Sequence, residues 1–226
     1  MRKTLRDNGL SLFFFAIFAA ALVGQAIAGN AEFNNEAIAH GSATKSLTSY
    51  VVSADFGQAV MENWQSEYLQ FTLFIVATVW FVQKGSPESK KVDEVGTQSD
   101  ADQKIGEHAD DDSPKWARAR GFKLWMYSNS LLLVMGTIWL GAWLAHSLTG
   151  WRTYNEQELE HGGTSALSWL QYLGTADFWE TTLQNWQSEF LAVGSMAVLA
   201  IYLRQRGSPE SKPVGASTRD ATGQEG

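Results

Sequence analysis

Apolar residues along this chain are concentrated in four blocks that long polar connectors separate. The two longest blocks are Leu10–Ala28, which contains one Gln and no charged residue, and Leu131–Leu148, which contains one His. A helix needs about 20 mostly apolar residues to cross a hydrocarbon core of ~30 Å. Both blocks are therefore predicted to be membrane-spanning helices.

The other two blocks, Tyr68–Val82 and Phe190–Leu203, are too short to span a membrane alone. Each follows an amphipathic stretch that opens with an acidic residue and a partner three positions later, as in a capping box. These pairs are Asp55 with Gln58 and Asp177 with Glu180. A helix over residues 56–83 would be about 42 Å long at 1.5 Å per residue. We predict two long helices whose first turns stand in the outer membrane interface.

Two further segments, Glu32–Gly41 and Thr153–Gly162, are predicted to be short external helices that end at their glycines. His40 and His161 fall in the last turns, where a helix C-terminus favours a cationic side chain. The alternative is a metal site that joins these histidines to an acidic residue. The candidates for that residue are Glu36 and Glu158.

The chain contains an internal duplication. The pentapeptide NWQSE occurs at Asn63–Glu67 and Asn185–Glu189, and GSPESK occurs at Gly85–Lys90 and Gly207–Lys212. Each repeat holds two predicted spans, so both repeats enter the membrane in the same orientation. The predicted fold is all-α: a four-helix transmembrane bundle of two parallel-repeat helical hairpins with short external interfacial helices.

The predicted domains are a first hairpin repeat (1–84), an acidic linker (85–120), a second hairpin repeat (121–206) and a tail (207–226). The linker and the tail are polar and poor in aromatic residues, which predicts disorder. The repeated GSPESK segments are predicted to stop the preceding helices, because Gly ends a helix and Pro prevents its continuation. A protein partner that docks on the linker stays an open alternative.

Positive charge gives the predicted orientation. Of 17 Lys and Arg residues, only Lys45 and Arg152 lie in the two connectors inside the hairpins. Because Lys and Arg collect on the cytoplasmic side, both termini and the linker are predicted to be cytoplasmic. The first span also reads as a cleavable signal peptide, since basic residues precede it and Ala26 to Ala28 match a cleavage pattern. The mid-chain equivalent of this span favours its retention.

Composition narrows the classes of function. The chain has no Cys, which excludes disulfides, thiolate chemistry and iron–sulfur clusters. Its net charge of −7 gives no indication of nucleic-acid binding. A nucleophile elbow, a phosphate-binding loop and an HExxH motif are missing from the sequence. No catalytic, cofactor or metal residue is therefore assigned, and the chain is predicted not to be an enzyme.

Small residues spaced four apart predict a helix-packing seam, because small side chains let helices approach closely in lipid. The seam residues are Ala16, Ala20, Gly24, Ala28, Thr137, Gly141, Ala145 and Thr149. Beside this seam, all four predicted helices carry polar residues at one depth. This candidate buried polar cluster comprises Gln25, Asn63, Glu67, His146, Asn185 and Glu189.

Two roles are open for the polar cluster. Its side chains can hydrogen-bond across helices and fix the bundle. They can also form a site for a proton, an ion or a small polar solute, because ionisable groups within a membrane are costly. If Glu67 and Glu189 approach closely, one of them should titrate well above its normal pKa.

Several segments resemble an uncharacterised family of small bacterial integral membrane proteins, known as a domain of unknown function. They are NGLSLFFFAIF, ALVGQAIAG, ENWQSEYLQ, NWQSEFLAVGSMAVL and LRQRGSPESKP. The resemblance covers almost the whole chain outside the linker and the tail. It implies a multi-pass protein of the bacterial inner membrane and supplies no ligand or site.

We therefore expect a non-enzymatic structural or accessory membrane protein, with a small transport element as the alternative. The expected partners are the lipid bilayer and, as open options, a second copy of the chain or a cytoplasmic protein.

Overall fold

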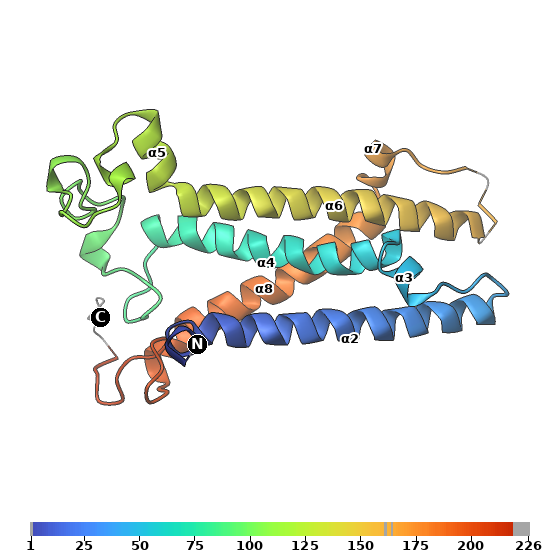
Figure 1. The fold of residues 1–226 in the computed structure, drawn as a ribbon, viewed down its shortest axis with the longest axis horizontal. Helices are drawn as coiled ribbons and strands as arrows, with labels where there is room; N and C mark the ends of the chain where they lie inside the picture. The colour runs from blue at the N-terminus through green and yellow to red at the C-terminus, as the bar shows by residue number, and fades with distance from the viewer. Residues whose placement is uncertain (1, 161, 164, 219–226) are drawn as a thin grey trace. The chain divides into compact units, whose positions relative to one another are not determined.

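The computed structural model describes residues 2–160, 162–163 and 165–218, and these residues form helices and turns with no strand (Figure 1). The α-helices are α1 (Arg2–Asp7), α2 (Gly9–Ala39), α3 (Leu47–Tyr50), α4 (Ala54–Trp80), α5 (Phe122–Ser128), α6 (Ser130–Glu160), α7 (Trp169–Tyr172) and α8 (Ala176–Tyr202). Three short 3-10 helices, η1 (Val92–Glu94), η2 (Gly106–His108) and η3 (Lys115–Arg118), interrupt the connector between α4 and α5.

The lengths of the helices repeat along the chain. Helices α2 and α6 both have 31 residues, α3 and α7 both have 4, and α4 and α8 both have 27. The shift is 130 − 9 = 121 from α2 to α6 and 176 − 54 = 122 from α4 to α8. The duplication in the sequence is therefore also a duplication of helices. The second copy has one extra residue between the start of α6 and the start of α8.

By packing, the chain divides into two compact units: Met1–Met61 with Ala145–Tyr172, and Glu62–Leu144 with Leu173–Gly226. This division does not follow the repeat, because α4 and α6 contribute to both units. The domain boundaries at residues 84, 120 and 206 remain predictions. Each unit is described separately.

In the first unit, α2 continues through the segment that was predicted to be a separate external helix. It ends at Ala39 and is capped by His40, whose Nδ1 lies 2.9 Å from the Glu36 carbonyl oxygen, and Gly41 follows with a φ of +71°. Helix α6 likewise continues to Glu160, and His161 lies outside the described residues. The prediction of separate short helices is wrong, because no proline breaks the backbone ladder after the apolar blocks.

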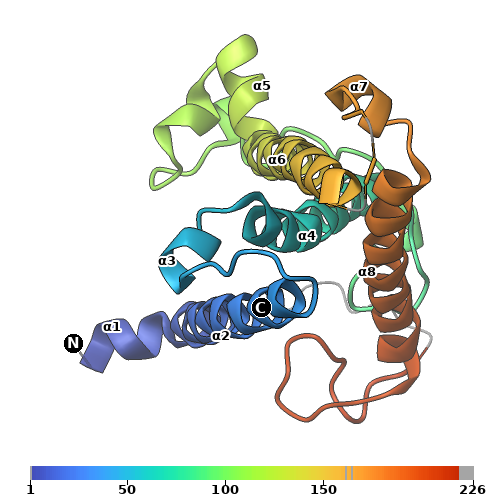
Figure 2. The same ribbon diagram turned by 90° about the vertical axis from the view of Figure 1, so that its right-hand side faces the viewer.

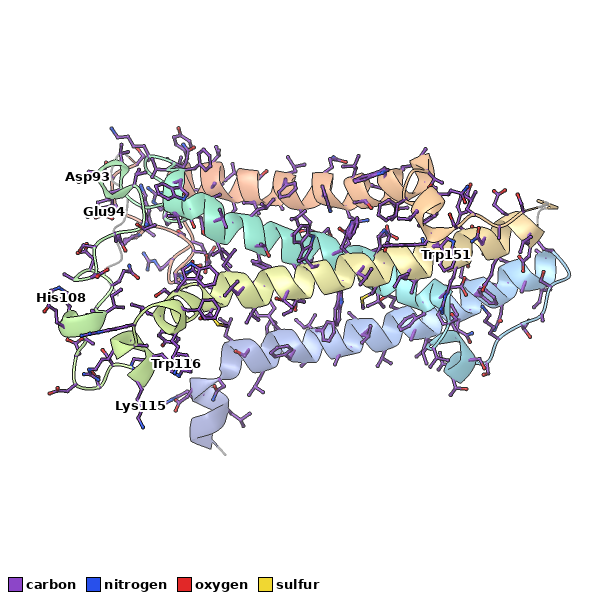
Figure 3. All side chains as sticks on the ribbon, turned by 90° about the horizontal axis from the view of Figure 1, so that it is seen from above. Asp93, Glu94, His108, Lys115, Trp116 and Trp151 are labelled. Carbon is purple, nitrogen blue, oxygen red and sulfur yellow. The ribbon has the colours of Figure 1, made fainter. Side chains whose placement is uncertain are left out.

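The connector after α2 is held by asparagine side chains. Asn34 accepts a hydrogen bond from the Lys45 N–H at 2.7 Å, and both Asn30 and Asn34 donate to the Lys45 carbonyl. The second copy repeats this arrangement at Leu167. There Asn155 accepts from the Leu167 N–H at 2.8 Å, and the Trp151 indole N–H (labelled in Figure 3) donates to the Leu167 carbonyl at 2.6 Å.

Each short helix supplies a tyrosine that packs on a glycine. Helix α3 lies against α2 (Figure 2). Its Tyr50 covers Gly29, where an added Cβ would lie 2.4 Å from the Tyr50 hydroxyl. In the second copy, Tyr172 of α7 is fully buried and covers Gly150 of α6. A Cβ at Gly150 would lie 2.5 Å from the Tyr172 hydroxyl, so only glycine permits this approach.

The N-termini of α4 and α8 differ from the predicted capping boxes. The hydroxyl of Thr175 accepts a hydrogen bond from the Phe178 N–H at 3.3 Å, and that of Ser53 accepts one from Phe56. Asp55 and Asp177 lie within the first turns, where a carboxylate favours the positive end of the helix dipole. The predicted caps are therefore wrong by two residues, because the hydroxyls bind the exposed backbone N–H groups first.

In the second unit, parts of α4, α6 and α8 pack together. A Cβ at Gly136 of α6 would lie 3.8 Å from the Thr72 methyl of α4. The rings of Trp143 on α6 and Phe178 on α8 meet edge to face with centroids 5.8 Å apart. Phe178 is fully buried, so it forms part of the core of this unit.

The connector from 85 to 120 contains short pieces of local structure. It contains η1, η2 and η3, and the Lys90 ammonium donates to the Gly96 carbonyl at 2.7 Å. Several of its charged and aromatic side chains are labelled at one end of Figure 3. Side chain to backbone hydrogen bonds hold these local turns, and disorder of the linker stays a prediction. The tail is described only to Thr218.

Two helices, α2 and α6, are long and apolar enough to cross a membrane. Little of either apolar stretch is buried, and α2 exposes consecutive phenylalanines at Phe13, Phe14 and Phe15. A helix that exposes so much apolar surface is unlike the core helix of a water-soluble protein.

Candidate functional site

The two copies of NWQSE meet in the second unit, where α4 lies beside α8. Asn185 donates from its side-chain amide to a carboxylate oxygen of Glu62 at 2.7 Å. One turn further on, the Trp186 indole N–H donates to the side-chain oxygen of Gln65 at 2.8 Å. These two hydrogen bonds define the NWQSE contact, which joins the first repeat to the second.

The α4 side of this contact is well buried. Gln65 and Ser66 have 0% and 1% of their surface exposed, and Leu69 on the next turn has 5%. Glu62, Gln65, Ser66 and Leu69 follow the i, i+3, i+4, i+7 spacing of one helix face. The Gln65 amide also donates to the Glu62 carbonyl at 3.1 Å, and the Ser66 hydroxyl donates to the Asn63 carbonyl at 2.8 Å.

In the NWQSE contact, the hydrogen-bond donors of α8 bind acceptors of α4. An amide N–H and an indole N–H each meet a strong acceptor, and a buried polar group without such a partner would cost about 1–3 kcal/mol. None of the ion pairs found among the described residues includes Glu62. The carboxylate is therefore held by a neutral donor, which suits a structural contact.

The structure distributes the predicted polar cluster over different environments. His146 is fully buried, Asn185 and Glu189 are half-buried, and Gln25, Asn63 and Glu67 are exposed. Of these six, the structure brings Asn185 into the NWQSE contact, while Glu67 and Glu189 interact electrostatically. Gln25 and His146 belong to the first unit and the other four residues to the second, so a single pocket formed by all six stays a prediction.

The residues of the predicted packing seam are divided between the two units, so the seam stays a prediction. The small residues of the first span, Ala16, Ala20, Gly24 and Ala28, are exposed, as are Thr137 and Gly141 in the second copy. A Cβ at Gly24 or at Gly141 would meet nothing within 4 Å. Ala145 and Thr149 are half-buried. A Cβ added at Gly57 of α4 would lie 2.9 Å from the methyl carbon of Thr149. Within the described helices, side chains approach the glycine backbone most closely at Gly29, Gly57 and Gly150, where tyrosine and threonine side chains fill the space of a Cβ.

Sequence reasoning missed Glu62, Gln65, Ser66 and Trp186. It took Asn63 and Glu67 as the important face, because the two residues are four positions apart in a repeated motif. The spacing of residues in the sequence contains a signal for the missed face, because Gln65, Ser66 and Leu69 lie on the same side of the helix as Thr72. That face is polar at Gln65 and Ser66 and apolar at Leu69, so residue polarity alone did not identify it as the buried face.

A second contact between repeats joins the two GSPESK segments. Each segment folds the same way: the Ser89 hydroxyl accepts from the Gln83 N–H at 2.8 Å, and the Ser211 hydroxyl accepts from the Gln205 N–H at 2.8 Å. Gly85 and Gly207 take φ values of +88° and +84°. The helices end earlier than predicted, at Trp80 and Tyr202, because these serines bind backbone N–H groups beyond the helix ends.

The side chains of Glu88 and Glu210 share a hydrogen bond across the two GSPESK segments. Burial, this hydrogen bond and the charge of Glu210 raise the pKa of Glu88 above its ordinary value of 4.5. A carboxyl whose pKa is raised by folding stabilises the contact fully below the unfolded pKa and loses that contribution as pH rises through the raised value. The GSPESK contact should therefore be tightest in acid.

We expect spin labels on cysteines placed at Lys84 and Arg206, both exposed, to show a narrow distance distribution below pH 4.5. The distribution should broaden as the pH rises. The variant Glu88→Gln, which keeps a neutral donor at every pH, should hold the narrow distribution throughout. A distance distribution that does not change with pH in the unsubstituted protein would contradict the shared proton.

A family model described as Domain of unknown function (DUF6766) matches residues 1–224. No curated protein and no solved structure matches the chain.

Proposed function

The chain belongs to the DUF6766 family, and we propose that it is a four-span membrane protein with a structural or accessory role rather than an enzymatic one. The observation that supports this role most directly is the NWQSE contact. The polar side chains of the repeated motif bind one another, so they join two hairpins in place of binding a substrate. Hydrogen bonds between membrane helices contribute about 1 kcal/mol each.

Exposed apolar surface supports the membrane location. Each fully exposed Leu or Phe side chain forgoes about 1.5–3 kcal/mol of burial in water, and hydrocarbon removes that cost. Helices α4 and α8 have 27 residues each, which gives about 40 Å at 1.5 Å per residue. That length exceeds the ~30 Å hydrocarbon core and leaves the polar first turns in the interface.

The positive charges support a bacterial inner-membrane orientation with the N-terminus, the linker and the tail in the cytoplasm. In this orientation the two GSPESK segments meet on the cytoplasmic side, and the connectors that carry α3 and α7 face outward. The NWQSE contact then lies near the outer interface.

Labelling of single cysteines tests the location, since the native chain has none to remove. A membrane-impermeant maleimide added to intact cells should label cysteines at Ser42 and Ser165, both exposed, and it should label one at Thr97 only after lysis. Release of the protein by carbonate wash would refute the membrane location. Labelling at Thr97 in intact cells would refute the proposed orientation.

A transport role is a second candidate, favoured by the electrostatic interaction between Glu67 and Glu189. Both carboxylates change to Gln in the double variant Glu67→Gln, Glu189→Gln, which retains hydrogen bonding. The structural role predicts the same proton flux in proteoliposomes for the wild type, the double variant and empty vesicles. Flux that the wild type supports and the double variant loses, with folding intact, would establish transport instead.

A further inference from the structure

A short segment before the apolar helix α6 combines exposed aromatic side chains with basic ones. It consists of η3 (Lys115–Arg118) and α5 (Phe122–Ser128), which pack against each other within the second unit. The rings of Trp116 on η3 and Tyr127 on α5 join the two helices, with their centroids 6.4 Å apart. We call residues 115–128 the η3–α5 element.

The side of α5 that points away from η3 is apolar and exposed. Phe122, Trp125 and Met126 follow the i, i+3, i+4 spacing of one helix face. Tyr127, which meets η3, lies on the opposite side of the helix. The exposed fractions of Phe122, Trp125 and Met126 are 71%, 53% and 44%. The rings of Phe122 and Trp125 are stacked with centroids 5.8 Å apart, so they form one continuous apolar surface.

The η3–α5 element carries four basic residues and no acidic one. Three of the basic side chains, Lys115, Arg120 and Lys123, are exposed and take part in none of the ion pairs found among the described residues. The nearest acidic residues in the sequence are at positions 110–112, and Asp110 of these is paired with Lys104 at 2.7 Å. The element therefore places positive charge that has no partner in the chain beside an apolar surface.

Other acidic residues of the connector lie on a different side of it. Figure 3 shows Lys115 and Trp116 well apart from Asp93 and Glu94. After the element, no Asp or Glu occurs before position 156. The chain therefore offers this basic surface no acidic segment on the side of α6.

An asparagine separates α5 from α6. Asn129 has a φ of −113° and a ψ of 11°, and its side-chain amide donates to the Trp125 carbonyl at 2.8 Å. The first copy has the same break at Asn8, 121 positions earlier, where α1 ends before α2 with a φ of −125° and a ψ of 19°. Figure 2 looks along α6 and shows that α5 does not continue its axis. The η3–α5 element is thus attached to the end of an apolar helix and turned out of its line.

We propose that the η3–α5 element binds anionic phospholipids of the cytoplasmic leaflet. The basic side chains contact the lipid phosphates, and the apolar face of α5 lies between the acyl chains. Helices that lie in a membrane interface combine basic residues with aromatic and apolar ones in this way. The inference rests on the proposed membrane location, because a span by α6 holds the attached element at the depth of the headgroups. It adds to that location a class of ligand and the residues that bind it.

An anionic lipid fits both parts of the element. Phosphate oxygens accept charge-assisted hydrogen bonds from Lys and Arg, and acyl chains cover Phe122, Trp125 and Met126. A zwitterionic lipid offers the same phosphate, but its ammonium group opposes the basic side chains. Each Lys or Arg near an anionic membrane surface strengthens binding about fivefold. A preference for anionic over zwitterionic headgroups therefore follows from the three exposed basic residues.

Fluorescence quenching by spin-labelled lipids tests the proposal on the full chain in vesicles. The fluorophore is attached to Met126→Cys, on the exposed face of α5, since the native chain has no other cysteine. The vesicles contain phosphatidylcholine and phosphatidylglycerol, one of which carries a doxyl group near the head of its acyl chain. We expect labelled phosphatidylglycerol to associate at this position at least about fivefold more tightly than labelled phosphatidylcholine. Added salt should lower this preference, because it screens exposed charges.

Neutral substitutions identify the residues responsible. The triple variant Lys115→Gln, Arg120→Gln, Lys123→Gln should lower the preference at Met126→Cys to a ratio of about one. The matched control removes the same number of charges from exposed positions elsewhere in the second unit and should keep the full preference. Its substitutions are Lys84→Gln, Lys91→Gln and Arg206→Gln. An equal loss in the control would overturn the proposal, because the preference would then depend on net charge alone.

A second probe separates headgroup binding from the membrane location. Leu140→Cys is at an exposed position in the apolar stretch of α6, and both lipids should quench it equally when the doxyl group is deep in the acyl chain. Quenching at Leu140→Cys with none at Met126→Cys would refute headgroup binding alone, as would equal quenching of Met126→Cys by the two lipids. No quenching at Leu140→Cys would refute the membrane location, and this inference with it.

Discussion

Replacing Gln65 by Ala is expected to destabilise the folded chain by about 2–4 kcal/mol, whereas Gln187→Ala should change stability by less than about 0.5 kcal/mol. The two glutamines occupy the same place in identical pentapeptides, so the change in helix propensity is the same for both. Only Gln65 is fully buried and accepts the Trp186 N–H. Its loss leaves a buried donor unsatisfied and a cavity beside Ser66.

Equilibrium unfolding in detergent, followed by circular dichroism at a dilution where the chain is monomeric, measures this difference. The double variant Gln65→Ala, Trp186→Ala should lose less than the sum of the two single variants, because the pair shares one hydrogen bond. Equal losses for Gln65→Ala and Gln187→Ala would show that α4 and α8 do not form the NWQSE contact.

Gly150→Ala is expected to lower the melting temperature, whereas Gly141→Ala on the same helix should raise it. A Cβ at Gly150 would lie 2.5 Å from the hydroxyl of Tyr172, which is fully buried and cannot swing away. Overpacking of this kind costs about 1–3 kcal/mol. At Gly141 nothing lies within 4 Å of the added carbon, so the better helix propensity of Ala, up to about 1 kcal/mol, remains.

For a chain of 226 residues, each kcal/mol shifts the melting temperature by about 2–4 °C. The hydroxyl oxygen is the colliding atom, and the next atom of the ring is 3.3 Å away. Adding Tyr172→Phe to Gly150→Ala should therefore restore part of the loss. A melting temperature that rises equally for both glycine variants would mean that Tyr172 does not cover Gly150.

The GSPESK and NWQSE repeats were visible in the sequence, and the equal lengths of α2 and α6, and of α4 and α8, follow that duplication. The continuous course of α2 into its last turns was not predictable from hydropathy. Polar residues after Ala28 look like the end of a span, yet backbone hydrogen bonds carry the helix on to Ala39. The N-cap of α4 was also predicted at the wrong residue, because several residues near position 54 can cap a helix. Only the folded geometry shows that the Ser53 hydroxyl accepts the Phe56 N–H.

By itself, the sequence determined the helical composition, the duplication and the apolar stretches of α2 and α6, since these depend on local periodicity and on segment identity. The tertiary structure alone decided which face of each NWQSE copy is buried. Two identical pentapeptides have the same local preferences, so only the neighbouring helix can make Gln65 buried and leave Gln187 exposed. The packing is therefore asymmetric although the two pentapeptides are identical. The reason is that α4 and α8 form a single contact, in which the two motifs use different faces.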